Sequence, residues 1–495
     1  MVAVAVAGLL VAVLLVLRPW QPITREANGT AGAPVVSEHD ASATPEQSIA
    51  VLPFADLSEK RDQEYFSDGL SEELTDMLTK VPELRVPART SAFYFKGKNE
   101  KLATIAKELR VAHVLEGSVR RAGDRFRITA QLVRVDNGYQ LWSETFDRST
   151  QDIFKVQDEI SAAVVSALKV KLAVGSQGLS SRGTSSAEAY THFLMGENFF
   201  NRYTDAGFQQ AIDAFQKAIK RDPLYGDAYA GMALAEAYVF DAHRNPATLK
   251  QALEDAEKGI ALAPTSSRAY RYRGWIRLQW LWDWTGAQSD FEKARALEPR
   301  DYHAEANYAT LLAYLGRVPE AIAETRKLLN VEPLGVSLLV NLTNYHTAMG
   351  DFVDAESTVR RAMEVEPADL YLVASLANVL TLQGKAAGAL ELCPRLPEEL
   401  DRLLCAAQAE HALGHIPESR RAMDEAVRRD GESRPFNIAL VYASLDEHDK
   451  AFEWLEKAYQ SRDMGISEIK LHWELRPLRA DPRYAALLRK MKLPA

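Results

Sequence analysis

Few residues of this chain have the types and spacing that chemistry requires. His411 and His415 stand four residues apart, so they could offer two nitrogens to a metal ion from one helical face. Gly414 interrupts that helix between them, and no third ligand is evident. The phosphate-loop, zinc-protease and nucleophile-elbow motifs are absent from the sequence. We therefore expect no catalytic residue, no metal site and no cofactor, and predict that the protein is not an enzyme.

A dense aromatic stretch is the second candidate site. Four indole rings fall within ten residues, at Trp275, Trp280, Trp282 and Trp284. They could form a ligand-binding surface. However, Trp282 shares helical faces with the apolar side chains of Ile276 and Leu278, which favours packing. We expect most of these rings to be core, and a ligand-facing role is the alternative.

The elements that would position such residues repeat along residues 189–463. Prolines close successive segments at Pro223, Pro264, Pro299, Pro333 and Pro367. The intervals are 41, 35, 34 and 34 residues, a period typical of two-helix repeat units. Short amphipathic helices cannot bury their apolar faces alone, so each unit must stack on its neighbours. The sequence therefore predicts about eight units in one all-α superhelix.

The internal frame of the units resembles the tetratricopeptide (TPR) repeat. Small residues flank a phenylalanine at fixed spacing in the second helix, as at Ala211, Phe215 and Ala218, and a proline closes the unit. The resemblance implies a concave groove, lined by first helices, that takes up protein or peptide partners. Four polar residues lie on the expected first helices and are our candidate partner-binding residues: Asn307, Asn341, Asn344 and Asn378. Simple solvation of a helix surface is the alternative.

Residues 48–175 have the pattern of a small α/β domain. Strands are predicted over residues 49–54, 84–87, 111–119, 125–135 and 139–146, and helices over 68–78, 102–109 and 152–172. Arg125 and Arg127 alternate with apolar residues. They indicate an exposed sheet face, and a basic binding face is the less favoured alternative.

This domain resembles the TolB N-terminal-like domain. The resemblance rests on S-I-A-V-L-P-F, Y-F-S-D-G-L-S-E-E-L, L-E-G-S-V-R-R-A-G-D-R-F and L-W-S-E-T-F-D-R. In bacteria such domains commonly precede TPR repeats. The family implies an N-terminal effector, either a winged-helix DNA-binding domain or a nucleotide cyclase domain, and neither is present in this sequence.

The N-terminus predicts a membrane anchor. Residues 2–17 are apolar and uncharged, and Arg18 and Trp20 follow them as interfacial residues. We assign residues 1–20 to a transmembrane helix and 21–47 to a flexible linker; an atypical signal peptide is the alternative. A second linker is expected over 176–188 and capping helices over 464–495. The resemblance implies a single-pass inner-membrane protein with its bulk in the periplasm, although Arg18 and Arg25 weakly favour the cytoplasm.

Composition narrows the choice of partners. The formal net charge of −9 argues against nucleic-acid binding by this chain. Cys393 and Cys405 are the only cysteines. We expect separate buried thiols and leave a bridge between them as the alternative.

These features together predict a membrane-anchored, non-enzymatic interaction or sensory scaffold. The main alternative keeps the fold but makes the chain the sensor half of a transcriptional regulator or cyclase. The effector domain would then lie upstream of this sequence. The oligomeric state is left open.

Overall fold

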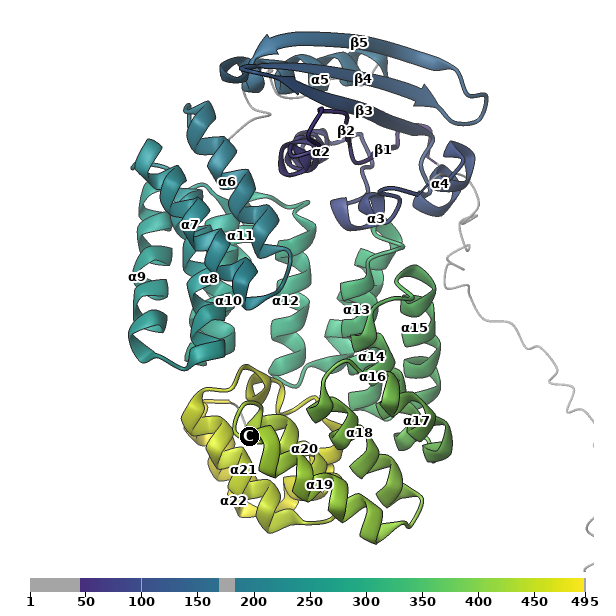
Figure 1. The fold of residues 1–495 in the computed structure, drawn as a ribbon, viewed down its shortest axis with the longest axis vertical. Coiled ribbons are helices and arrows are strands. Elements are labelled where there is room, and N and C mark those ends of the chain that lie inside the picture. Colours follow the sequence, from purple (N-terminus) through teal and green to yellow (C-terminus); the bar gives the residue numbers. More distant parts are fainter. Residues whose placement is uncertain (1–44, 99, 169–182, 494–495) are drawn as a thin grey trace, which may run out of the picture. The chain divides into compact units, whose positions relative to one another are not determined.

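The computed structural model describes residues 45–98, 100–168 and 183–493 (Figure 1). The expected anchor over residues 1–20 lies outside this part of the chain, as do most of the two expected linkers. Among the described residues, no helix has the length and apolarity needed to cross a membrane.

The N-terminal domain is built on one small sheet. Its strands are β1 (Ile49–Val51), β2 (Ala55–Asp56), β3 (His113–Ala122), β4 (Arg125–Arg134) and β5 (Gln140–Ser149). The order is β1-β3-β4-β5, and β2 also pairs with β3. β1 and β2 run parallel to β3, whereas β3, β4 and β5 form an antiparallel meander. The helices are α2 (Glu64–Thr79), α3 (Arg89–Phe93), α4 (Leu102–Leu109) and α5 (Ile153–Ala167).

The predicted strand over residues 84–87 is wrong. The structure has only an isolated parallel bridge there, between Ser48 and Arg85. Pro87 has no N–H to donate to a neighbouring strand, so the ladder cannot continue through it. The chain instead turns into the short helix α3.

Eight antiparallel helix pairs follow, and we number them as units one to eight. They are α6 (Ala187–Phe200) with α7 (Asp205–Arg221), α8 (Gly226–His243) with α9 (Pro246–Leu262), α10 (Ser267–Ile276) with α11 (Trp284–Leu297), α12 (Tyr302–Tyr314) with α13 (Val318–Val331), α14 (Val336–Met349) with α15 (Phe352–Val365), α16 (Leu370–Leu382) with α17 (Ala386–Leu392), α18 (Glu399–Ala412) with α19 (Ile416–Asp430), and α20 (Pro435–Ser444) with α21 (His448–Ser461). The two-helix repeat predicted from the period is confirmed.

The small residues of the repeat make room for the phenylalanine. Phe215 on α7 is fully buried. A Cβ atom added at Gly196 would come within 2.5 Å of its ring, and one added at Gly231 within 2.7 Å. Glycine on the first helices of units one and two is therefore required by this contact. The longer 35-residue interval also has a local cause, because α10 continues into a π-helical turn over Arg277–Leu281.

The third unit contacts both the C-terminal segment and the eighth unit. The C-terminal segment consists of the 3-10 helices η5 (Met464–Glu468) and η6 (Trp473–Ala480) and of α22 (Pro482–Lys490). The indole N–H of Trp284 donates to the carbonyl of Met491 at 2.7 Å. Trp282 stacks on Tyr459 with ring centroids 5.1 Å apart. Units three and eight are therefore in contact although they are not sequence neighbours, which an array with contacts between sequence neighbours alone would not show.

The α/β domain meets the array through two reciprocal helix caps. The Arg300 guanidinium donates to the carbonyls of Val81 and Leu84 at 2.8 and 2.7 Å, beyond the C-terminus of α2. The carboxylate of Glu332 lies at the N-terminus of α3, where it accepts hydrogen bonds from Ala88 N, Ser91 N and the hydroxyls of Thr90 and Ser91. These contacts give hydrogen-bond partners to backbone groups near the two helix ends, among them Leu84 O, Ala88 N and Ser91 N.

Ala355 tests the helix contact inside one unit. It lies on α15 and is fully buried. Replacement with leucine is expected to cost about 1–3 kcal/mol, because it adds volume to a closely packed contact. Hydrogen exchange should show the largest loss of protection in α14 and α15. Equal loss throughout the array would contradict the assigned contact.

The control for this substitution is Glu364, which is exposed. Glu364→Ala is expected to change the stability by less than about 0.5 kcal/mol. The period also predicts that Glu356 is exposed, and this is wrong. Hydrogen bonds from Lys385 and Arg360 lower the pKa of Glu356 to about 2, and its side chain is only 18% exposed.

Candidate partner-binding face

Polar side chains recur at equivalent positions of the first helices, and we call this surface the first-helix face. His303, Ser337 and Tyr371 are the second residues of α12, α14 and α16, at intervals of 34 residues. All three are exposed, and Tyr371 is 59% exposed. One helical turn further on, Asn307 and Asn341 occupy equivalent positions and are half-buried. Because the repeat places equivalent residues on successive first helices, these polar side chains form rows across neighbouring units.

The four predicted asparagines differ in their availability. Among the described residues, the side chains of Asn307 and Asn341 have no hydrogen-bond partner. Asn344 hydrogen-bonds the phenol of Tyr371 on the next first helix. Asn378 donates to Glu474 Oε1 at 2.9 Å, so the chain itself already occupies it. The side-chain amides of Asn307 and Asn341 are therefore available to hydrogen-bond another molecule.

The C-terminal segment lines one border of the first-helix face. Tyr314 donates to Glu468 Oε1 at 2.8 Å. His472 lies 3.7 Å from the carboxylates of both Glu468 and Glu474. Burial alone would lower the pKa of His472, but the two nearby carboxylates outweigh this effect and raise the pKa to about 9. A charged imidazolium therefore holds this segment together at neutral pH.

The aromatic stretch serves packing. Trp280 is fully buried, and Trp282 and Trp284 are almost fully buried. Trp280 donates to Asp241 Oδ1 at 3.1 Å. Half-buried Trp275 donates to the Tyr238 hydroxyl at 3.2 Å. The favoured interpretation from the sequence agrees with these contacts, although the buried N–H of Trp282 has no hydrogen-bond partner among the described residues.

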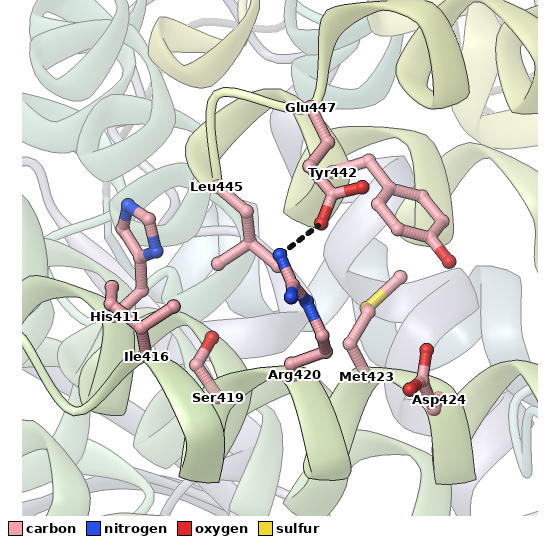
Figure 2. Close-up of a pocket in the computed structure, with 9 residues that line it drawn as sticks. All are labelled: His411, Ile416, Ser419, Arg420, Met423, Asp424, Tyr442, Leu445 and Glu447. Atoms are coloured by element: carbon pink, nitrogen blue, oxygen red, sulfur yellow. Dashed lines mark ion pairs between the residues drawn. The ribbon is translucent and has the colours of Figure 1, made fainter.

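A small cavity of about 70 Å³ lies where the seventh and eighth units meet. Figure 2 shows the residues that line it: His411, Ile416, Ser419, Arg420, Met423, Asp424, Tyr442, Leu445 and Glu447. Arg420 approaches Glu447 across it at 3.9 Å. This volume is well below the roughly 300 Å³ at which small-molecule sites begin. The cavity suits at most one side chain.

The histidine pair does not converge on a metal. His415 Nδ1 instead contacts Glu410 Oε2 at 2.7 Å, while His411 borders the cavity. Within the described residues, no group of three or more side chains could hold a metal ion.

Arg125 and Arg127 on β4 form ion pairs within the sheet. Both Arg125 and Arg127 donate to the carboxylate of Asp147 on β5, at 2.8 Å each. Because both arginines are ion-paired, the less favoured basic binding face gains no support.

The two cysteines are paired, which corrects the expectation of separate thiols. Cys393 and Cys405 form a disulfide with a Cα–Cα distance of 5.5 Å. Helix α17 has only seven residues, and a short 3-10 turn at Cys393–Arg395 brings the chain back onto α18. This early return places the two side chains within bonding range.

Sequence reasoning missed part of the first-helix face. His303, Ser337 and Tyr371 could have been found by reading every position of the first helix at the 34-residue period. The contacts that the C-terminal segment makes through Glu468 and Glu474 carry no such signal, because these two residues lie outside the repeats.

Two family models match parts of the chain. The model described as HilA/YgeH-like transcriptional regulator, second domain, matches residues 45–163, which cover nearly all of the α/β domain. A tetratricopeptide repeat model matches residues 436–462, within α20 and α21. The helix pairs are therefore TPR-like repeats, whereas the resemblance to the TolB N-terminal-like domain stays a prediction.

One relative and two solved structures are similar to parts of this chain. A Rhizobium meliloti (strain 1021) protein named "Putative adenylate cyclase 3" is 37% identical over 238 residues, which are 47% of this chain and 40% of that protein. A tetratricopeptide repeat protein from Parabacteroides merdae ATCC 43184 matches 53% of this chain and 99% of its own, at 13% identity and a TM-score of 0.39. A human IFIT1 dimer with PPP-AAAA matches 62% and 78%, at 15% identity and a TM-score of 0.40.

Proposed function

We propose that this chain is a non-enzymatic, membrane-anchored scaffold that binds a protein or peptide partner through the first-helix face. The observation that carries the proposal is the pair of half-buried, unpartnered amides at Asn307 and Asn341, in register and beside exposed His303, Ser337 and Tyr371. A side-chain amide both donates and accepts, so a row of amides matches the alternating groups of a partner's backbone. TPR-like repeats make such a row continuous across units.

Two features support a location at the membrane and outside the cytoplasm. The apolar stretch over residues 2–17 supports the anchor. The disulfide between Cys393 and Cys405 supports an oxidising compartment for the array, because cytosolic thiols are normally kept reduced. Together they favour a periplasmic bulk on a single-pass inner-membrane protein.

A second candidate function is the sensor half of a transcriptional regulator or cyclase. It is favoured by the match to the second domain of HilA/YgeH-like regulators and by the longer relative named as a cyclase. The reading frame upstream of Met1 distinguishes the two. An in-frame effector domain would favour the sensor, and the first-helix face would then sense the partner rather than only hold it.

Partner binding is testable by photo-crosslinking in intact cells. A benzophenone amino acid at Tyr371 is expected to give a discrete adduct, because this position lies on the first-helix face. The matched control is Val353, which is 78% exposed but lies on the second helix α15. Equal adducts from both positions, or none at Tyr371, would contradict the proposal.

A further inference from the structure

Strand β5 forms an open edge of the sheet. It is ten residues long and pairs only with β4 in the described part of the chain. Most of its first six residues are exposed, including Glu144 and Thr145. Protein edges of this length are normally guarded by charged side chains, especially lysine, by proline, by a bulge or by a covering element. The charged residues of β5 are Glu144, Asp147 and Arg148, and its bulge lies near its first residues. β5 contains neither lysine nor proline.

The outward-facing backbone groups of β5 can be assigned from its register. Thr150 N donates to Asp124 O, so the backbone of residue 150 faces β4. The pairing is regular from Trp142 to Ser149, and the one bulge lies beyond Trp142. Inward and outward residues alternate along an antiparallel strand. Ser143, Thr145 and Asp147 therefore point their N–H and C=O groups away from the sheet. The Asp147 carbonyl accepts hydrogen bonds from Arg125 Nη2 at 3.0 Å and Arg148 Nη1 at 3.3 Å, and these must shift when a second strand pairs there.

The side chains of β5 are complementary to a second copy of the same strand. Antiparallel pairing about a two-fold axis at Phe146 sets Glu144 opposite Arg148, and symmetry makes this pair twice. It also sets the Thr145 hydroxyl opposite the Asp147 carboxylate. Arg148 makes two long intramolecular hydrogen bonds, to Asp147 O at 3.3 Å and to Glu159 Oε2 at 3.4 Å, so it can turn toward a new carboxylate. Opposite charges across strands stabilise pairing, and like charges oppose it.

We propose that two copies of this chain associate by antiparallel pairing of their β5 strands, centred on Phe146. The result is one continuous sheet across a two-fold axis, in which both edge strands are covered. Partners bound by the two arrays would then be held by one dimer.

The test is sedimentation equilibrium of the full chain in detergent micelles, over about 1–100 µM. The wild type is expected to dimerise. Glu144→Arg places two arginine pairs opposite each other, and is expected to raise the dimer dissociation constant at least about tenfold. The double variant Glu144→Arg/Arg148→Glu restores opposite charges and is expected to return within about threefold of the wild type.

Circular dichroism controls for folding, since position 144 is exposed. A monomeric wild type would overturn the proposal. A dissociation constant that Glu144→Arg leaves unchanged, or that the charge exchange fails to restore, would do the same.

Discussion

Replacing Trp284 with alanine is expected to lower the stability of the third unit by about 3–5 kcal/mol. The indole is 6% exposed, packs within a core that includes Leu487 and Met491, and donates to the Met491 carbonyl. Its removal leaves a large cavity and an unpaired carbonyl. Because the contact joins residues 207 positions apart, the damage should reach α22 as well as α11.

Hydrogen exchange read peptide by peptide measures this effect. The matched control is Phe215→Ala. This substitution also removes a fully buried aromatic side chain, but Phe215 packs between units one and two. It should cost a similar amount and leave protection of α22 unchanged. If Trp284→Ala affected only its sequence neighbours, the contact between the third unit and the C-terminal segment would be wrong.

Raising the pH from about 5 to about 8 is expected to weaken the junction between the α/β domain and the array by on the order of 3 kcal/mol. Glu332 is fully buried at this junction. Burial raises its pKa to about 7, although hydrogen bonds from Thr90, Ser91 and Ala88 offset part of the effect. The folded junction therefore binds the proton more tightly than the open one. The contribution is fully present below the ordinary carboxyl pKa and is lost as the pH rises through 7.

Hydrogen exchange of the Ala88 and Ser91 amides, corrected for intrinsic exchange at each pH, measures this opening. Tyr302 contacts the same site, Arg85 donates to Asn330 O and Arg361 to Pro333 O, but arginines and phenols do not titrate in this range. Glu332→Gln resembles the protonated acid and cannot ionise, so its pH slope should be smaller. Equal slopes in both proteins, or tighter closure at high pH, would exclude Glu332 as the cause.

The repeat array was predictable because its physics is local and periodic. The apolar face of each helix and the closing prolines recur at intervals of 34 to 41 residues, and stacking follows from them. The same period places Asn307 and Asn341 on one face. Strand pairing depends on contacts between distant residues. The expected strand over residues 84–87 does not form, because Pro87 has no N–H to donate to a neighbouring strand.

Contacts between distant parts of the chain left no pattern in the sequence. Trp284 and Met491 carry no shared period, so their contact could not be inferred. Asn378 has the same position in the repeat as Asn344, yet it hydrogen-bonds Glu474 of the C-terminal segment. The usual burial of free thiols predicts two separate cysteines. Their pairing depends on the early end of α17, which the sequence pattern does not indicate.

The measurement that tests the account most directly is the photo-crosslinking yield at Tyr371 in wild type and in Asn307→Ala/Asn341→Ala. Both asparagines lie one unit or more before Tyr371, so their removal leaves the crosslinking position intact. Glu364→Ala is the control for the chain's expression and folding. We expect the discrete adduct to fall at least about tenfold in the double variant and to remain in the control, because each lost amide removes hydrogen bonds worth about 1 kcal/mol or more. An adduct of unchanged yield in the double variant would show that the first-helix face does not bind the partner.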